Sequence, residues 1–246
     1  MELPGSTRNV IKGGYALLTP GSLVASRLPG WEKAVCNVLV SPAMGAHFTQ
    51  LLATLEHDGQ CLGNTGANEY LVYVLEGNAG IVLDDRRHRL EPGSFAYVPA
   101  DKDVQIKSAA AGTRILIFQK RYEAMPGVAK PSAMVAHERD IKGQPVSGSD
   151  GARVQALLPD DPAFDMAVNV LTFQPGAGLA AVEAPAMEHG LIILRGTGIF
   201  RLDVDWHPVQ AGDMIWTAPY CPQWFVAIGK AQASYIRYQN VNREPM

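Results

Sequence analysis

The sequence predicts an all-β protein made of two similar halves, and three observations support this prediction. The chain repeats itself at an offset of 119 residues. Its apolar residues fall in short runs bounded by turn residues, with turn signals every 8–12 residues or so, as is typical of β-sandwiches and barrels. The 246 residues include 24 Gly and 17 Pro, an abundance of turn formers that disfavours a helical bundle.

The repeat is clearest where residues 69–77 align with residues 188–196. The same ungapped register then aligns a series of identical pairs: Leu83 with Leu202, Asp84 with Asp203, His88 with His207, and Gly93 with Gly212. From about residue 34 to residue 98 this register aligns turn residues of one half with turn residues of the other. It therefore indicates two homologous domains of roughly 100 residues.

Three regions follow from this repeat. Residues 1–120 form a first domain, and residues 151–246 form a second. Between them, residues 121–150 are rich in Pro, Gly and Ser and are predicted to be an interdomain connection. The strands of the second domain are expected at Leu191–Leu194, Ile199–Leu202, Trp206–Gln210, Met214–Thr217, Gln223–Ile228 and Ser234–Gln239, with turns such as Gly196-Thr-Gly198 between them.

Composition excludes several classes of protein. With 47% hydrophobic and 18% charged residues the chain is not disordered, and a net charge of −3 gives no reason to expect a nucleic-acid or membrane partner. No stretch approaches the roughly 20 apolar residues of a membrane span, and no signal peptide is evident. Three widely spaced cysteines favour a reducing compartment, so we expect a cytoplasmic protein.

The second half contains the candidate chemistry. Its strand–turn–strand with Gly196-Thr-Gly198, its Ala211-Gly-Asp213 turn and its Pro-rich corner at 219–222 resemble the two motifs of the cupin superfamily. That resemblance implies a pair of small jelly-roll barrels, a bicupin, with one divalent metal inside a barrel. The matching positions are Glu183, Pro185, His189 and Gln223.

A narrower resemblance extends over nearly the whole chain. The chain is similar to the (S)-ureidoglycine aminohydrolase family of purine (allantoin) breakdown, on motifs at both ends: Ala16-Leu-Leu-Thr-Pro20, Leu28-Pro-Gly-Trp31, Ser41-Pro-Ala-Met-Gly45, Arg121-Tyr-Glu123, Asp205-Trp206, Tyr220-Cys-Pro-Gln223 and Val241-Asn-Arg243. The family implies a manganese-dependent hydrolysis, in which ureidoglycine and water give ureidoglycolate and ammonia.

The family's site residues transfer only in part. The resemblance implies that Glu183, His189 and Gln223 bind Mn²⁺ or another divalent metal, and that Glu183 also contacts the leaving amine. Pro185 stands where the family has a fourth ligand, a His. The substrate-binding Tyr and Lys of the family match Phe200 and Gln239, which lack the hydroxyl and the charge.

The residue types themselves suit such an ion. Carboxylate and amide oxygens are hard ligands that suit Mn²⁺ or Mg²⁺, and imidazole adds affinity. Three protein ligands leave open positions for substrate and water. Glu188, adjacent to His189 on the same strand, is expected to face the opposite way, toward solvent or an interface.

Two other functions stay open at this point. Because Pro185, Phe200 and Gln239 depart from the family's site, the protein could be a non-catalytic or differently specific cupin that binds a small metabolite. An isomerase or dioxygenase is disfavoured, because iron chemistry prefers two His and a carboxylate. The first half offers only Asn64, Gly66, Tyr70 and Val104 or Asp103 at the equivalent positions, so we expect it to be a scaffold without a metal. We expect a small-molecule substrate and a homo-oligomer.

Overall fold

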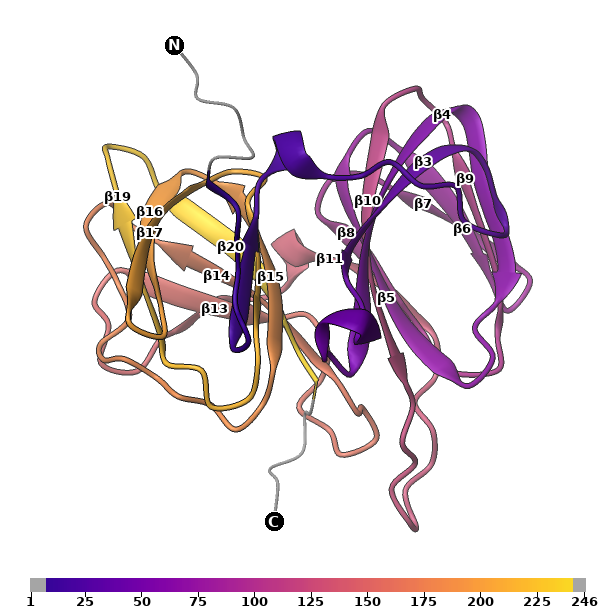
Figure 1. Cartoon of the computed structure of the whole chain (residues 1–246). Coiled ribbons are helices and arrows are strands. Elements are labelled where there is room, and N and C mark those ends of the chain that lie inside the picture. The colour runs from indigo at the N-terminus through magenta and orange to yellow at the C-terminus, as the bar shows by residue number, and fades with distance from the viewer. Residues whose placement is uncertain (1–7, 241–246) are drawn as a thin grey trace. The chain divides into compact units, whose positions relative to one another are not determined.

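The computed structural model describes residues 8–240, and its regular secondary structure is almost entirely β-strand (Figure 1). The helical segments include the short 3₁₀ turns Pro20–Ser22, Pro42–Met44 and Glu138–Asp140. None of them has the length or apolar character of a transmembrane helix. The chain divides into two compact units, and the predicted all-β, two-barrel architecture is confirmed.

One unit, here called the N-terminal barrel, comprises residues 24–140 and 161–165. Its sheet runs in the order β11-β8-β5-β10-β4-β9-β6-β7, and β3 pairs with β4. The strands are β3 (Trp31–Val40), β4 (Phe48–Asn64), β5 (Asn68–Glu76), β6 (Ala79–Leu83), β7 (Arg86–Leu90), β8 (Ser94–Val98), β9 (Asp103–Ser108), β10 (Thr113–Arg121) and β11 (Met134–His137).

The other unit, the C-terminal barrel, comprises the described residues 8–23, 141–160 and 166–240. One sheet has the order β1-β2-β18-β15-β20-β14-β13-β12, and a second has the order β17-β16-β19. The strands are β1 (Val10–Ile11), β2 (Tyr15–Leu18), β12 (Gln144–Pro145), β13 (Ala152–Ala156), β14 (Ala167–Phe173), β15 (His189–Arg195), β16 (Thr197–Leu202), β17 (Asp205–Gln210), β18 (Met214–Thr217), β19 (Gln223–Ile228) and β20 (Ala233–Gln239).

The boundaries of the units differ from the predicted 1–120, 121–150 and 151–246. Residues 8–23 belong to the C-terminal barrel, because the apolar strand β2 pairs with the edge of β18. The predicted connection is shared, since β11 pairs with β8 of one barrel and β12 pairs with β13 of the other. Residues 161–165 belong to the N-terminal barrel, where buried Asp165 forms an ion pair with buried Lys120.

The strand registers reproduce the sequence repeat. The pairs Tyr70–Val98 and Ile81–His88 of the N-terminal barrel recur, 119 residues later, as His189–Thr217 and Phe200–His207. A polar contact recurs as well, because Tyr97 donates a hydrogen bond to Glu69 (2.6 Å) and Trp216 donates one to Glu188 (3.2 Å). Glu188 therefore faces away from His189 as predicted, and of the two predicted surroundings, solvent or an interface, solvent is wrong because the side chain is fully buried.

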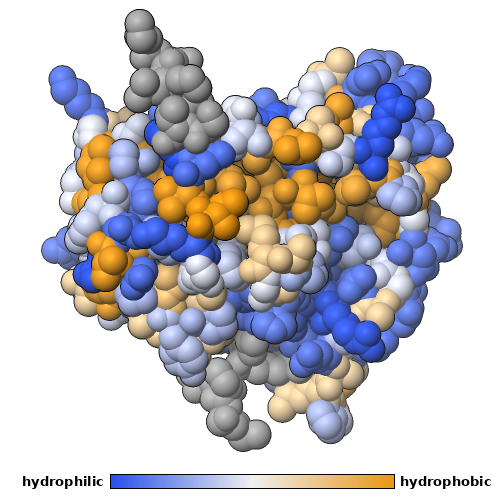
Figure 2. Space-filling model, in the orientation of Figure 1, coloured by the Kyte–Doolittle hydropathy of each residue, from blue (hydrophilic) through white to orange (hydrophobic). Residues whose placement is uncertain are grey.

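Alternation along the strands separates core from surface. In β9 the residues Val104, Ile106 and Ser108 are buried, whereas the intervening residues are exposed. Hydrophilic residues accordingly cover much of the N-terminal barrel at the right of Figure 2. Each barrel has its own core, since period-2 patterning places one set of apolar side chains inside. The C-terminal core is rich in aromatic rings, among them Phe173, Phe200, Phe225 and Tyr235.

A bidentate ion pair ties the start of the chain to the C-terminal barrel. Arg8 contacts both carboxylate oxygens of Asp213 at 2.6 and 3.0 Å, and Asp213 has no exposed surface. Changing Arg8 to Ala should lower the free energy of unfolding by about 2 kcal/mol, because a buried carboxylate loses its charged partner. Thermal and urea unfolding would measure this. Arg87→Ala, an exposed site on β7, is the control, and equal stability of the two variants would contradict the prediction.

A second polar cluster on the same segment predicts a pH dependence. Tyr15 donates a hydrogen bond to Asp205 (2.6 Å) and lies 3.1 Å from Nε2 of His207, while Lys12 contacts Asp205 at 2.5 Å. Burial lowers the pKa of His207 below its ordinary 6.5. The negative charge of Asp205 acts to raise this pKa, and the positive charge of Lys12 acts to lower it. The folded form therefore binds a proton at His207 less readily than the unfolded form, and stability is lost as pH falls below about 6.5.

This predicts a lower melting temperature at pH 5 than at pH 7.5. His207→Gln should reduce that difference, since Gln does not titrate. A residual slope is expected from His189, whose pKa burial also lowers, so the test compares the slope of the variant with that of the wild type. An unchanged slope in the variant would show that His207 does not contribute. His88→Gln, at the repeat-equivalent position in the N-terminal barrel, is the matched control.

Candidate metal centre

The site residues come from strands whose alternation is fixed by the C-terminal core. On β15, Leu191 and Ile193 lie in the core cluster, so His189 at the start of that strand faces the barrel interior too. On β19, Phe225 and Ala227 lie in the same cluster, so Gln223 also faces inward. These two predicted ligands are 34 residues apart in sequence and meet inside one barrel.

His189 and Gln223 are in direct contact. Gln223 Nε2 lies 2.8 Å from His189 Nδ1, and the two residues are 1% and 2% exposed. Oxygen Oε1 of Gln223 is buried and has no hydrogen-bond partner among the described residues. A buried acceptor without a partner costs about 1–3 kcal/mol, so this oxygen is a donor atom held ready for a cation or a ligand.

The environment keeps His189 neutral. Burial, with a smaller effect from the positive charge of Arg237, lowers the pKa of His189 to about 3. A neutral imidazole has a free nitrogen lone pair, which is the form that coordinates a metal.

Glu183 is held beside Gln223 by the backbone. The two residues exchange hydrogen bonds in both directions, at 2.9 and 2.7 Å, as an isolated antiparallel bridge. Directly opposed residues project their side chains to the same face, with Cβ atoms about 5 Å apart. Glu183 is exposed, so it lies on the inward face but at the solvent side of the barrel. Its charge contributes to raising the pKa of the core residue Tyr235, after the larger effect of burial.

The three departures from the family's pattern also have defined places. Pro185 is half-buried, and its carbonyl oxygen accepts a hydrogen bond from the backbone of Tyr220 (2.7 Å). Phe200 is 1% exposed and packs against Phe225 and Tyr235, with ring centroids 5.4 and 5.9 Å apart. Gln239 lies directly opposite His189 in the β15–β20 ladder, so both side chains project to the same face. Val241–Arg243 lies outside the described residues.

Two polar residues near His189 were not predicted from the sequence. Thr217 lies directly opposite His189 in the ladder to β18, and its hydroxyl is buried without a hydrogen-bond partner among the described residues. Arg237 lies on β20 between Tyr235 and Gln239 on the inward face. Counting every second residue back from Gln239 along the predicted strand 234–239 was the signal that could have found Arg237.

The donor atoms of Glu183, His189 and Gln223 fit a hard divalent cation, provided that the amide oxygen of Gln223 takes part. Within residues 8–240 no three His, Cys, Asp or Glu side chains are grouped as a metal site needs. An ion held by Glu183 and His189 would therefore depend on the orphaned amide oxygen of Gln223 as its third donor. Carboxylate, imidazole and amide oxygen together suit Mn²⁺ or Mg²⁺ better than the softer metals, which select thiolates.

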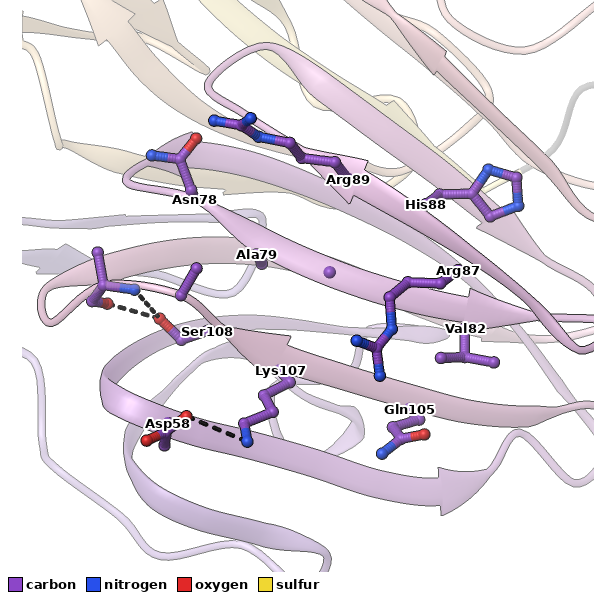
Figure 3. A pocket seen from close by; sticks show the side chains of 13 residues that line it. Asp58, Asn78, Ala79, Val82, Arg87, His88, Arg89, Gln105, Lys107 and Ser108 are labelled. Atoms are coloured by element: carbon purple, nitrogen blue, oxygen red, sulfur yellow. Dashed lines mark hydrogen bonds and ion pairs between the residues drawn. The ribbon is translucent and has the colours of Figure 1, made fainter.

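The N-terminal barrel offers no comparable set. Its equivalents of His189, Gln223 and Phe200 are Tyr70, Val104 and Ile81, as the strand registers show. It has a groove of about 660 Å³, but this lies on the outer face of β6, β7 and β9 (Figure 3). The charged groups that line the groove are cationic apart from one carboxylate, Asp58, which forms an ion pair with Lys107 (3.1 Å). This groove is not a metal centre.

Known proteins resemble the chain over its full length. An Arabidopsis thaliana (S)-ureidoglycine aminohydrolase is 35% identical over 248 residues, covering 100% of this chain and 82% of the relative. The Escherichia coli (S)-ureidoglycine aminohydrolase is 32% identical over 245 residues, covering 97% and 93%. The crystal structure of Ylba from E. coli superposes with a TM-score of 0.87 at 29% identity, covering 97% of this chain and 96% of that one.

A more distant neighbour shares the fold alone. Oxalate decarboxylase from Bacillus subtilis, a protein with Mn(II) centres, superposes with a TM-score of 0.71 at 11% identity, covering 93% of this chain and 78% of that one. No family model matches the sequence.

Proposed function

The chain belongs to the (S)-ureidoglycine aminohydrolase family, and from that premise we propose that its C-terminal barrel hydrolyses (S)-ureidoglycine to (S)-ureidoglycolate and ammonia. The observation that supports this most directly is the contact of buried His189 with buried Gln223, next to Glu183. Full-length similarity to two curated aminohydrolases supplies the reaction.

We further propose that Glu183, His189 and Gln223 hold Mn²⁺ or another divalent metal. When bound, such an ion supplies Lewis-acid polarisation and fixes the orientation of the substrate. Similarity in fold to a barrel with Mn(II) centres supports the choice of metal, and so does the hardness of the two oxygen donors.

The chain's own residues supply the rest of the chemistry. Phe200, Phe225 and Tyr235 form an aromatic floor that keeps water out of the inner end of the site. Glu183, at the solvent side, is placed to take a proton from the incoming water at a carboxylate oxygen and to deliver one to the departing amine nitrogen. The C–N bond of the amine breaks, a C–O bond forms from water, and ammonia leaves.

Ammonia release is the test of this function. The Mn²⁺-loaded protein, given freshly generated ureidoglycine, should release ammonia above the spontaneous background. Glu183→Gln should reduce the rate by 100-fold or more, since a positioned acid–base group contributes about 10²–10⁴-fold. Glu91→Gln in the N-terminal barrel is the control. If the Mn²⁺-loaded wild type releases no ammonia, the proposed hydrolase function is wrong and the metabolite-binding alternative takes its place.

Pro185→His should strengthen the metal site. The variant adds an imidazole at the position where the family has its fourth ligand, and we expect Mn²⁺ affinity to rise about tenfold or more. Titration calorimetry of metal-free protein measures this without relying on activity. Pro208→His, on an exposed position of β17, is the matched control. An affinity that rises equally in both variants would mean that Pro185 is not beside the ion.

Three further expectations remain predictions: a cytoplasmic location, a homo-oligomeric state and a role in allantoin breakdown. The metabolic role follows from the proposed substrate, whereas location and oligomeric state rest on the sequence alone.

A further inference from the structure

Strand β20 places an arginine inside the C-terminal barrel. Ala233 and Tyr235 lie in the core cluster, so alternation puts Arg237 and Gln239 on the same inward face. Arg237 is directly opposite Leu191 of β15 on one side and Asn169 of β14 on the other. Leu191 is a core residue with no exposed surface, which confirms the inward direction from a second strand.

The guanidinium is close to the candidate metal centre. Its positive charge acts to lower the pKa of both His189 and Tyr235, against burial in the case of Tyr235. Nε of Arg237 is buried and has no hydrogen-bond partner among the described residues. Within residues 8–240 the structure shows no carboxylate in an ion pair with Arg237.

A partly buried cation without a partner is costly, because the charge loses water without gaining a compensating contact. Such a group fits a site whose missing partner is an anionic ligand. A guanidinium suits a carboxylate in particular, since its planar fork donates two parallel hydrogen bonds. Ureidoglycine carries one carboxylate.

The position also accounts for a departure in the sequence. Gln239 stands where the family's substrate-binding Lys is expected, so this chain lacks that positive charge. Arg237 lies two residues earlier on the same face, about 6.6 Å along the strand. An arginine side chain is long enough to bring its charge toward the same space.

We propose that Arg237 binds the substrate carboxylate in the C-terminal barrel, supplying from the neighbouring inward position the charge that Gln239 lacks. This inference rests on the proposed function for its choice of substrate. It makes Arg237 a substrate-binding residue, and it predicts a preference for small ureido compounds with a free carboxylate.

Binding of stable analogues tests the proposal apart from turnover. The probes are N-carbamoylglycine, which has a carboxylate, and N-carbamoylglycinamide, which is neutral at that position. Calorimetry with Mn²⁺-loaded wild type should show tighter binding of the carboxylate. Arg237→Gln should weaken that binding roughly tenfold to a hundredfold, the value of a charge-assisted contact, and leave the amide nearly unchanged. Arg201→Gln, on the outer face of β16, is the control for loss of one positive charge.

A charge relocation separates a binding role from a structural one. The double variant Arg237→Gln with Gln239→Lys should recover at least part of the carboxylate affinity, and Arg237→Lys should retain more than Arg237→Gln. In turnover, Arg237→Gln should raise KM more than it lowers kcat. Melting temperature and Mn²⁺ content verify that each variant is folded and loaded.

The outcomes keep the two proposals apart. Ammonia release by the wild type together with equal binding of N-carbamoylglycine to wild type and Arg237→Gln overturns the role of Arg237 and leaves the hydrolase intact. Arg237-dependent binding of the carboxylate without ammonia release retains the anion site and overturns the hydrolase. If Arg237→Gln loses affinity for both analogues equally, the proposal is also overturned, because the residue then has only a structural role in the barrel.

Discussion

His189→Ala is expected to abolish tight Mn²⁺ binding and to lower ammonia release by a factor of 10³ or more. His189 is the one nitrogen donor in the proposed set, and it is neutral because it is buried. Its loss leaves an exposed carboxylate and an amide oxygen, too few ligands for a stable ion. Metal content after gel filtration and the ammonia assay measure the two effects.

The matched control is His88→Ala in the N-terminal barrel. His88 is the repeat equivalent of His207 and lies far in sequence from the proposed ligands. His189→Ala also leaves a cavity, so a melting temperature is needed for each variant. A folded His189→Ala variant that keeps stoichiometric Mn²⁺ would show that the metal lies elsewhere.

Gly198→Ala is expected to destabilise the C-terminal barrel by about 1–3 kcal/mol. A methyl group at Gly198 would lie 2.2 Å from Cε2 of Phe225 and 2.7 Å from the carbonyl oxygen of Val226. Phe225 packs against Phe200 and Tyr235, so its displacement also disturbs the floor of the site. Thermal unfolding together with the ammonia assay would show both consequences.

The repeat supplies a rescue for this variant. In the N-terminal barrel the equivalent positions hold Ala79 and Ile106, a methyl group beside a smaller side chain. Gly198→Ala combined with Phe225→Ile copies that pair and should recover part of the stability. Gly80→Ala, where the nearest atom is 3.7 Å from the added methyl group, is the control. A double variant less stable than the sum of the two single changes would contradict this account.

The sequence alone was sufficient to predict those features that depend on local periodicity and on the repeat. Runs of apolar residues between turn residues predicted β15 to β20 of the C-terminal barrel, whereas β1, β2 and β12 to β14 were not predicted. The 119-residue register predicted that the two halves share one fold, and the structure shows this in detail, because the ladder that joins Tyr70 to Val98 recurs as the one that joins His189 to Thr217. Full-length similarity confirmed the family.

Other features depend on contacts that no local pattern specifies. Glu183 lies in an irregular segment, and two backbone hydrogen bonds to Gln223 fix its position. Strand β2 has an ordinary apolar sequence, and nothing in it indicates that its partner is β18, about 200 residues later. Arg237 is a different case, because the alternation of β20 does place it on the inward face, but it matches none of the family's motif positions.

The pairing of β2 with β18 has a consequence for how the protein is made. Thr217 is synthesised about 200 residues after Tyr15, yet these two residues lie opposite each other in one sheet. The strands of the N-terminal barrel lie between β2 and β18 in the sequence, so that barrel can fold first, whereas the C-terminal barrel closes only once β18 has been synthesised and pairs with β2. Such long-range closure is slow. A fragment that begins at residue 141 would expose the edge of β18 and be prone to aggregate.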